Sequence, residues 1–154
     1  MAFISLDADP NPTLDTLRIV GGQLMMASHD FNKARYAVES YMVSGEYALA
    51  RENLATIETA LSFESLTEPS INGKTVGDRA VQTQAWLATN QVLQKAKAEM
   101  KRAEQTLTML KIAADGAEQT YKALTHRLNG ARAEATLLAA FANADTADSA
   151  SEMV

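Results

Sequence analysis

Residues 96–142, AKAEMKRAEQTLTMLKIAADGAEQTYKALTHRLNGARAEATLLAAFA, decide the fold of this chain. Apolar residues recur along this stretch at spacings that alternate between four and three, and half of them are alanine. They are Ala96, Met100, Ala103, Leu107, Leu110, Ala114, Ala117, Tyr121, Leu124, Leu128, Ala131, Ala135, Leu138 and Ala142. A sustained period of 3.5 residues is typical of a left-handed coiled-coil seam. The sequence therefore predicts an all-α protein in which residues 77–142 form one long helix.

Residues 12–62 carry a second, less regular version of the same pattern. Asn11-Pro12 favours a helix start, because asparagine caps free amide groups and proline suits the first helical position. Positions at alternating spacings of three and four follow in two registers: Leu14, Leu17, Gly21, Leu24, Ser28, Phe31, Arg35, Val38 and Met42, then Tyr47, Ala50, Leu54, Ile57 and Leu61. Gly21-Gly22 and Ser44-Gly45 are weak points. This pattern predicts one interrupted helix or two helices in line.

A single connector, residues 63–76, separates the two helical arms. It contains Pro69 and the pair Asn72-Gly73, which is a strong turn signal, and a small β-hairpin is possible there. Thr75, with Asp78 three residues later, resembles a capping box and marks the next helix start. The two arms around one connector predict a long antiparallel helical hairpin, in a single domain that spans residues 1–154.

An alanine-rich seam of this length predicts association with further helices. The first arm is shorter and interrupted, so we expect the seam from Ala96 to Leu138 to join copies of the chain in a homo-oligomer. Met109, Ile112, Ala113, Leu137 and Phe141 widen the apolar stripe. A stripe of that width favours a bundle of more than two helices.

The ends and the composition predict a protein of the cytoplasm. Residues 1–12 lack the basic region of a secretory signal, and no run of about 18 apolar residues is present to span a membrane. The chain has no cysteine, which fits a reducing compartment. Residues 143–154, NADTADSASEMV, are small, acidic and without a pattern, and we expect this tail to be disordered.

Residue patterns of known catalytic sites are nearly absent. The two histidines are His29 and His126, and His126 falls on the side opposite the seam. Gly73-Lys74-Thr75 resembles the end of a phosphate-binding loop, but the upstream glycine that the motif requires is absent, and the segment before it contains Pro69. The sequence therefore predicts a protein without a catalytic centre, a metal site or a cofactor.

Charge is distributed unevenly along the chain. The net charge is −5, but residues 1–73 hold ten acidic and four basic side chains, whereas residues 74–134 hold ten basic and six acidic ones. The basic cluster Lys95, Lys97, Lys101 and Arg102 has two interpretations. It is a surface that follows the phosphates of single-stranded nucleic acid, or a solvated face that pairs with the acidic first arm.

Residues 71–87, INGKTVGDRAVQTQAWL, resemble the start of the second helix in small coiled-coil accessory proteins encoded by phages and prophages. In those proteins a short Gly-Lys-Thr or Gly-Lys-Asn turn precedes a helix with an early arginine, here Arg79. The resemblance extends over about residues 64–140. It implies a phage accessory protein in a bacterial host cell, near recombination or replication functions, and transfers no functional residue.

Two classes of function follow from these observations. The first is a non-enzymatic assembly or adaptor protein that binds a protein partner. The alternative is an accessory protein of DNA recombination or replication that binds single-stranded nucleic acid through the basic helix face.

Overall fold

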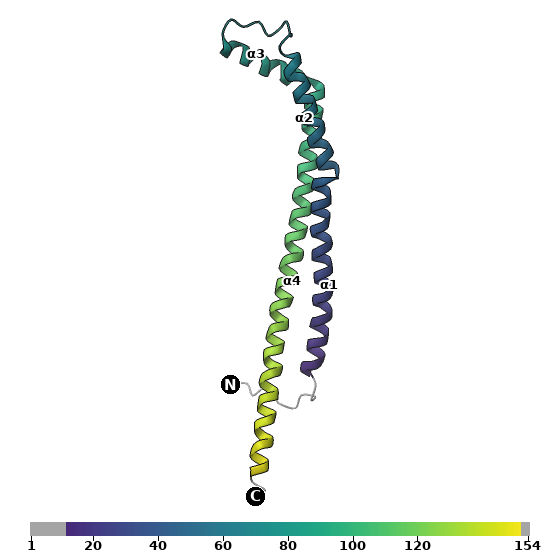
Figure 1. Ribbon diagram of the computed structural model, residues 1–154, viewed down its shortest axis with the longest axis vertical. Helices are drawn as coiled ribbons and strands as arrows, with labels where there is room; N and C mark the ends of the chain where they lie inside the picture. Colours follow the sequence, from purple (N-terminus) through teal and green to yellow (C-terminus); the bar gives the residue numbers. More distant parts are fainter. Residues whose placement is uncertain (1–11, 152–154) are drawn as a thin grey trace, which may run out of the picture. The chain divides into compact units, whose positions relative to one another are not determined.

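The computed structural model describes residues 12–151, with side chains described for residues 14–144. It contains four helices, namely α1 (Pro12–Val43), α2 (Glu46–Glu64), α3 (Val76–Thr89) and α4 (Gln91–Ser151), which Figure 1 shows in chain order. The described residues include no strand, so the predicted all-α class is confirmed and the possible β-hairpin in the connector is absent. None of the helices in the described part is long and apolar enough to cross a membrane.

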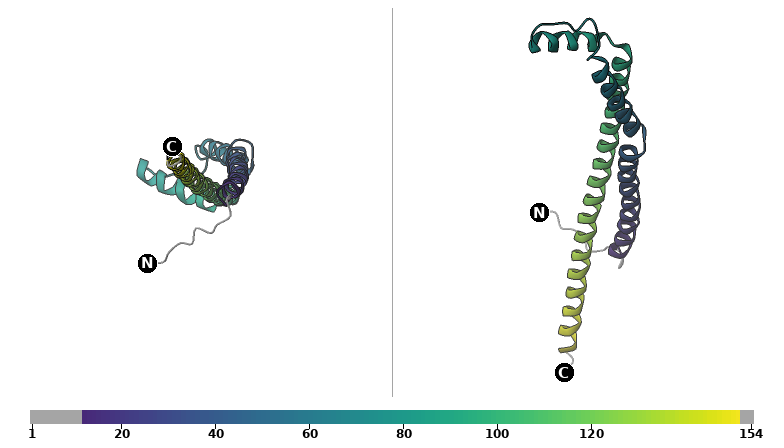
Figure 2. Two further views of the ribbon diagram at one scale, coloured as in Figure 1. Left: turned by 90° about the horizontal axis from the view of Figure 1, so that it is seen from below. Right: turned by 45° about the horizontal axis from the view of Figure 1, so that its top comes forward.

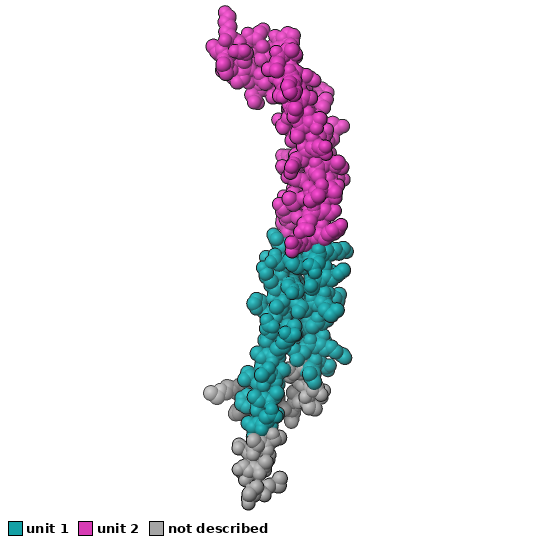
Figure 3. Space-filling model, viewed as in Figure 1, with its two compact units in different colours: residues 1–33, 115–154 teal, residues 34–114 magenta. Residues whose placement is uncertain are grey.

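The chain divides into two compact units, which Figure 3 shows in different colours. Unit 1 comprises residues 1–33 and 115–154, and unit 2 comprises residues 34–114. Each unit pairs the first helical arm with the second, because α1 and α4 both contribute residues to both units. Antiparallel pairing of the two arms therefore occurs twice, with a separate core in each unit.

Unit 1 is a helix pair formed by the first part of α1 and the second part of α4. Val20 and Ala27 of α1 are buried, and so are Leu128 and Ala131 of α4. Phe31 and Tyr121 stack across the pair with ring centroids 6.2 Å apart and ring planes 14° apart. Offset stacking at this distance adds about 0.5–1.5 kcal/mol to what the buried area alone contributes.

The inner face of α1 differs by a partial rotation from the one that the sequence predicted. Leu14, Arg35 and Met42 are exposed, whereas Val20 and Ala27, which the predicted spacing omitted, are buried. The predicted positions Leu17, Leu24, Phe31 and Val38 are half-buried, as are Gly21 and Ser28. The small residues Gly21 and Ser28 explain this rotation. They contribute little apolar surface, so burying their side of α1 stabilises the pair less than burying the side of Val20 and Ala27.

Unit 2 packs α2 against the first part of α4, and α3 lies crosswise over the end of this pair (Figure 2). The predicted positions of the second register in the first arm, from Tyr47 to Leu61, are all half-buried or buried. On the α4 side the core consists of Leu93, Ala96, Ala103 and Leu107. The two alanines between the two leucines allow the close helix approach that the sequence predicted.

The first arm breaks at Ser44-Gly45, one of the two predicted weak points. A Cβ atom on Gly45 would lie 2.7 Å from Cα of Tyr41, so any larger residue would force the two turns apart. Gly21-Gly22, the other weak point, lies within α1 and does not interrupt it. Close approach of the backbone, not helix propensity alone, therefore decides where the first arm divides.

The connector covers residues 65–75 and is held by hydrogen bonds to α3. Thr75 and Asp78 form the predicted capping box, in which Oγ1 of Thr75 accepts from the amide of Asp78 at 3.1 Å. Gln82 accepts a hydrogen bond from the amide of Gly73 at 2.7 Å and donates to Asn72. A Cβ on Gly73 would lie 2.6 Å from Cβ of Asp78, so this turn requires glycine.

The prediction of one continuous helix over residues 77–142 is wrong, because the chain turns at Asn90. The backbone of Asn90 is extended, with φ −74° and ψ 107°, and its amide donates to the carbonyl of Leu87. Its side-chain oxygen accepts from the amide of Leu93 at 3.0 Å, which caps the start of α4. Asparagine at this position therefore ends one helix and starts the next.

The prediction of a disordered tail over residues 143–154 is also wrong for most of the segment. Helix α4 continues to Ser151, and residues 152–154 lie outside the described part. This segment is rich in alanine, which has the highest helix propensity, so the helix can extend here without a regular apolar stripe.

Candidate interaction surfaces

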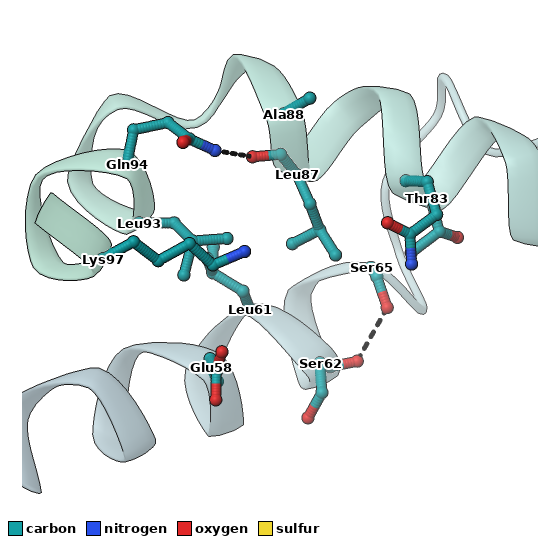
Figure 4. Close-up of a pocket in the computed structure, with 11 residues that line it drawn as sticks. Glu58, Leu61, Ser62, Ser65, Thr83, Leu87, Ala88, Leu93, Gln94 and Lys97 are labelled. Carbon is teal, nitrogen blue, oxygen red and sulfur yellow. Dashed lines mark hydrogen bonds between the residues drawn. The ribbon is translucent and has the colours of Figure 1, made fainter. Parts of the chain in front are cut away.

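An open pocket lies at the bend between α2, α3 and α4, and we call it the elbow pocket (Figure 4). Its volume is about 450 Å³. The side chains of Leu61, Leu87 and Leu93 form its apolar wall, one from each helix. The turn at Asn90 creates this pocket, because it lets α3 leave the axis of α4.

The rim of the elbow pocket is polar. It consists of hydroxyl, amide and charged side chains: Glu58, Ser62, Ser65, Thr83, Gln84, Gln94 and Lys97. The hydroxyl of Ser65 donates to the carbonyl of Ser62 at 2.8 Å, and the Gln94 amide donates to the carbonyl of Leu87. An apolar wall with a polar rim accepts an apolar side chain of a binding partner.

Groups that could carry acid–base or metal chemistry do not converge in the described residues. Within this part of the chain no three histidine, aspartate or glutamate side chains lie close enough together to hold a metal ion. His29 and His126 are exposed, on α1 and α4 respectively. The elbow pocket contains one carboxylate, Glu58, and one amine, Lys97, as its ionisable groups.

The seam predicted from the sequence forms the inner face of α4. Ala96, Ala103, Leu107, Leu128 and Ala131 are buried. Other members up to Ala135 are half-buried, and only Leu138 and Ala142, at the end, are exposed. Helices of the same chain cover this seam within each unit. A second copy could reach it only by displacing α1 or α2, and the predicted oligomer through these residues stays a prediction.

The four residues of the basic cluster are all exposed and lie off the seam, as the sequence predicted. They do not form one patch. At about 100° of rotation per residue, Lys95 and Arg102 lie about 20° apart on one flank of α4, and Lys97 and Lys101 lie about 40° apart on the other. Lys97 borders the elbow pocket, whereas Arg102 borders a separate groove with Glu46, Leu49 and Asn53.

Pairing of the acidic and basic arms does not involve direct ion pairs. Among the described side chains, ion pairs connect Arg35 with Glu39 and Lys122 with Glu118, each within one helix. No carboxylate of α2 lies within ion-pair distance of a basic side chain of α4 in the described part. The four cations of the basic cluster, which form no ion pair in the described part, therefore keep their capacity to bind an external anion.

Helices α2 and α4 of unit 2 each carry a second regular stripe opposite the buried one, a feature that the sequence did not predict on α2. We define the α2 outer face as Leu49, Glu52, Thr56, Thr59 and Phe63 of α2 with Leu66 at the start of the connector, and the α4 outer face as Lys95, Ala98, Arg102, Gln105, Met109 and Ile112. All twelve residues are exposed. Phe63 is 68% exposed, Met109 69% and Ile112 60%.

Threonines make the α2 outer face more apolar than its composition suggests. The hydroxyl of Thr56 donates to the carbonyl of Glu52 at 2.9 Å, and that of Thr59 donates to the carbonyl of Ala55 at 2.7 Å. A threonine whose hydroxyl bonds back to its own helix turns its methyl group outward. Together with Ala55, Ala60 and Phe63, these methyls line a shallow depression on α2.

The fold and these surfaces define a class: an all-α protein of antiparallel helix pairs with exposed apolar stripes. Comparison with models of protein families, with curated proteins and with solved structures gives no match.

Proposed function

We propose that this chain is a non-enzymatic coiled-coil assembly or adaptor protein that binds a protein partner through the outer faces of its helices. The observation that carries the proposal is the number of large apolar side chains that stay exposed after both units have formed their cores. Leu49, Phe63, Met109 and Ile112 are each at least 60% exposed. Met109 and Ile112 are neighbours on one face of α4, and exposed large apolar side chains that gather on one face mark an interaction site.

The location of the protein belongs to the same proposal. We place it in the cytoplasm of a bacterial cell, as a phage-encoded accessory protein. The support is the resemblance of residues 71–87 to such proteins and the absence of cysteine from the chain.

A pull-down from extract of the source cell tests the adaptor function. The variant Met109→Gln/Ile112→Gln removes apolar surface from the α4 outer face, and Leu137→Gln is the matched control because Leu137 lies on α4 with 59% exposure. We expect the double variant to recover at least about tenfold less of a specific partner, identified by mass spectrometry, which corresponds to about 1.4 kcal/mol. Equal recovery by the double variant and the wild type would contradict the proposal.

A second candidate function is supported by the exposed, unpaired cations of α4. Single-stranded nucleic acid would bind to one or both basic flanks, with affinity that falls as salt rises. Two charge-reversal variants separate the flanks: Lys95→Glu/Arg102→Glu and Lys97→Glu/Lys101→Glu. If this function is correct, wild type binds a labelled oligonucleotide at about 50 mM salt and at least one variant loses binding while it sediments unchanged.

A further inference from the structure

We infer that the partner of the α2 outer face is the α4 outer face of a second copy of this chain. The inference rests on the proposed function and names a partner for the surfaces on which that function depends. The partner of both faces is therefore another copy of the same chain. The experiment below distinguishes this partner from a different protein or a nucleic acid.

The first support is the matched spacing of the two faces. Residues recur at intervals of three and four along both of them, from Leu49 to Leu66 and from Lys95 to Ile112. Two helices with this spacing pack with their side chains interlocked, as in a coiled coil. Each face is also of similar length, with six positions over eighteen residues.

The second support is charge. Helix α2 carries four acidic and one basic side chain, a net charge of −3, whereas residues 91–114 of α4 carry five basic and two acidic ones, a net charge of +3. Glu52 lies in the α2 outer face, and Lys95 and Arg102 lie in the α4 outer face. Arg102 borders a groove that Glu46 of the same chain also lines, whereas Glu52 and Lys95 are exposed and form no ion pair within the described residues, so a second molecule can match them.

The third support is register. Leu61 and Leu93 line the same pocket inside unit 2, and Ala50 and Ala103 line the same groove. Copies that stack side by side at the same level and in the same direction repeat this register across the new interface. Glu52 of one copy then lies opposite Arg102 of its neighbour.

The same register brings apolar residues together at one end of the interface. Val43, at the end of α1 and 80% exposed, lies at the level of Met109 and Ile112. The ionic centre favours this register, because a shift by one turn would place Glu52 opposite Ala98 or Gln105, neither of which carries a positive charge.

The geometry makes the interface heterologous. Apart from Leu49 and Arg102, which line one groove, the members of the two faces point away from each other by rotation about their helices, so the surface that one copy offers differs from the surface that it uses on its neighbour. Such contacts repeat from copy to copy and produce a ring or a filament, not a closed two-fold dimer.

Two face variants and their mixture test this inference. The α2-face variant is Glu52→Lys/Phe63→Lys, which keeps the α4 outer face intact. The α4-face variant is Met109→Gln/Ile112→Gln, which keeps the α2 outer face intact. All four positions are exposed, and lysine and glutamine are good helix formers, so both variants keep the helicity of the wild type by circular dichroism. Leu137→Gln is again the matched control.

Sedimentation velocity at tens of micromolar gives the decisive readout. We expect wild type and Leu137→Gln to sediment above the mass of one chain, each face variant to sediment as one chain, and an equimolar mixture of the two variants to form a complex of two chains. The mixture forms this complex because each variant supplies the face that the other lacks.

Three results would overturn the inference. They are a wild type that stays a single chain, a mixture that stays dissociated, and an α2-face variant that assembles as wild type does. If wild type is a single chain but the pull-down still recovers a partner through the α4 outer face, the inference about a second copy fails and the adaptor function stands. If both fail, the proposed function fails as well.

Discussion

The inner and outer faces of α4 follow the same seven-residue period, but they have opposite relations to the rest of the chain. The inner face, with Leu107 at 7% exposure, is covered by helices of the same molecule. The outer face, with Met109 at 69% exposure, is covered by none. The comparison shows that a coiled-coil period identifies a binding face without identifying what binds there. In this chain the alanine-rich stripe builds the fold, and the mixed basic and apolar stripe stays exposed.

The largest expected loss of stability follows from placing a charge on the inner face of α4. Leu107→Asp places a carboxylate in a buried site without a partner and removes apolar contacts, so we expect a loss of about 3–5 kcal/mol in the free energy of unfolding. Urea unfolding followed by circular dichroism measures it. Met109→Asp, two residues later, is the control, and should lose about 1 kcal/mol at most, through helix propensity. Similar losses for the two variants would mean that α4 has no distinct inner face.

A smaller effect is expected from Leu93→Ala at the wall of the elbow pocket. Leu93 is 2% exposed, and removal of its side chain leaves a cavity that costs about 2–4 kcal/mol. Its neighbour Val92 is 62% exposed, so Val92→Ala should change the free energy of unfolding by less than about 0.5 kcal/mol. The urea concentrations at the unfolding midpoints of the two variants compare a buried and an exposed residue at adjacent positions of α4. A midpoint for Leu93→Ala equal to that of wild type would contradict the packing of unit 2.

Asn90→Ala tests the residue at which α4, with its inner and outer faces, begins. The variant loses the hydrogen bond from the Leu93 amide to the Asn90 side chain, and we expect a loss of about 1 kcal/mol, typical of a helix N-cap. Gln91→Ala serves as the control, because Gln91 makes no capping bond in the described structure. Thermal unfolding compares the two, and a stability of Asn90→Ala at or above that of the control would show that the cap does not hold the bend.

The smallest effect concerns polar residues on the outer surface of α1. Arg35 and Glu39 form an ion pair at 3.1 Å, with their side chains 67% and 59% exposed. Solvent and salt screen such pairs, so Glu39→Gln should cost only about 0.3–0.5 kcal/mol, less at high salt. A double-mutant cycle with Arg35→Gln measures the coupling. A coupling energy above about 1 kcal/mol would show that polar outer residues stabilise the fold as inner ones do.

The all-α fold and the inner face of α4 could be predicted from the sequence because a single period persists from Ala96 to Ala135. The inner face of α1 could be predicted only in part. Gly21 and Ser28 fall at heptad spacing, and a spacing criterion cannot distinguish them from Val20 and Ala27, one residue away. Area decides between the two registers, since valine and alanine bury more apolar surface than glycine and serine.

The bend at Asn90 was missed because polar residues interrupt the seam between Val81 and Leu93, and the hydrophobic period there does not show where one helix ends. Apolar residues continue on both sides, at Leu87 and Leu93, and only a local capping bond marks the change of direction. The elbow pocket, which depends on this bend, could therefore not be predicted either. Asparagine followed three residues later by a buried leucine is the signal that was available.

The basic cluster was predicted correctly as exposed and off the seam, but its division into two flanks was not. Counting charges along the chain puts Lys95, Lys97, Lys101 and Arg102 together, whereas rotation about the helix axis separates them into two pairs. The α2 outer face was missed because Thr56 and Thr59 read as polar in the sequence. Their backbone hydrogen bonds, visible only in the folded helix, make them apolar toward a partner.

The most direct test of the outer faces as a contact between copies is carbodiimide cross-linking of an equal mixture of ¹⁵N-labelled and unlabelled chain. This reagent joins a carboxylate to an amine in direct contact, and mass spectrometry distinguishes bonds between copies, in which one peptide is labelled and the other is not. We predict mixed-isotope peptides that join Glu52 to Lys101, the amine next to Arg102 at the level opposite Glu52, with Lys101→Arg as a control that keeps the charge and removes the amine. Cross-links that form only within single chains, with no mixed-isotope peptide from α2 and α4, would contradict the account.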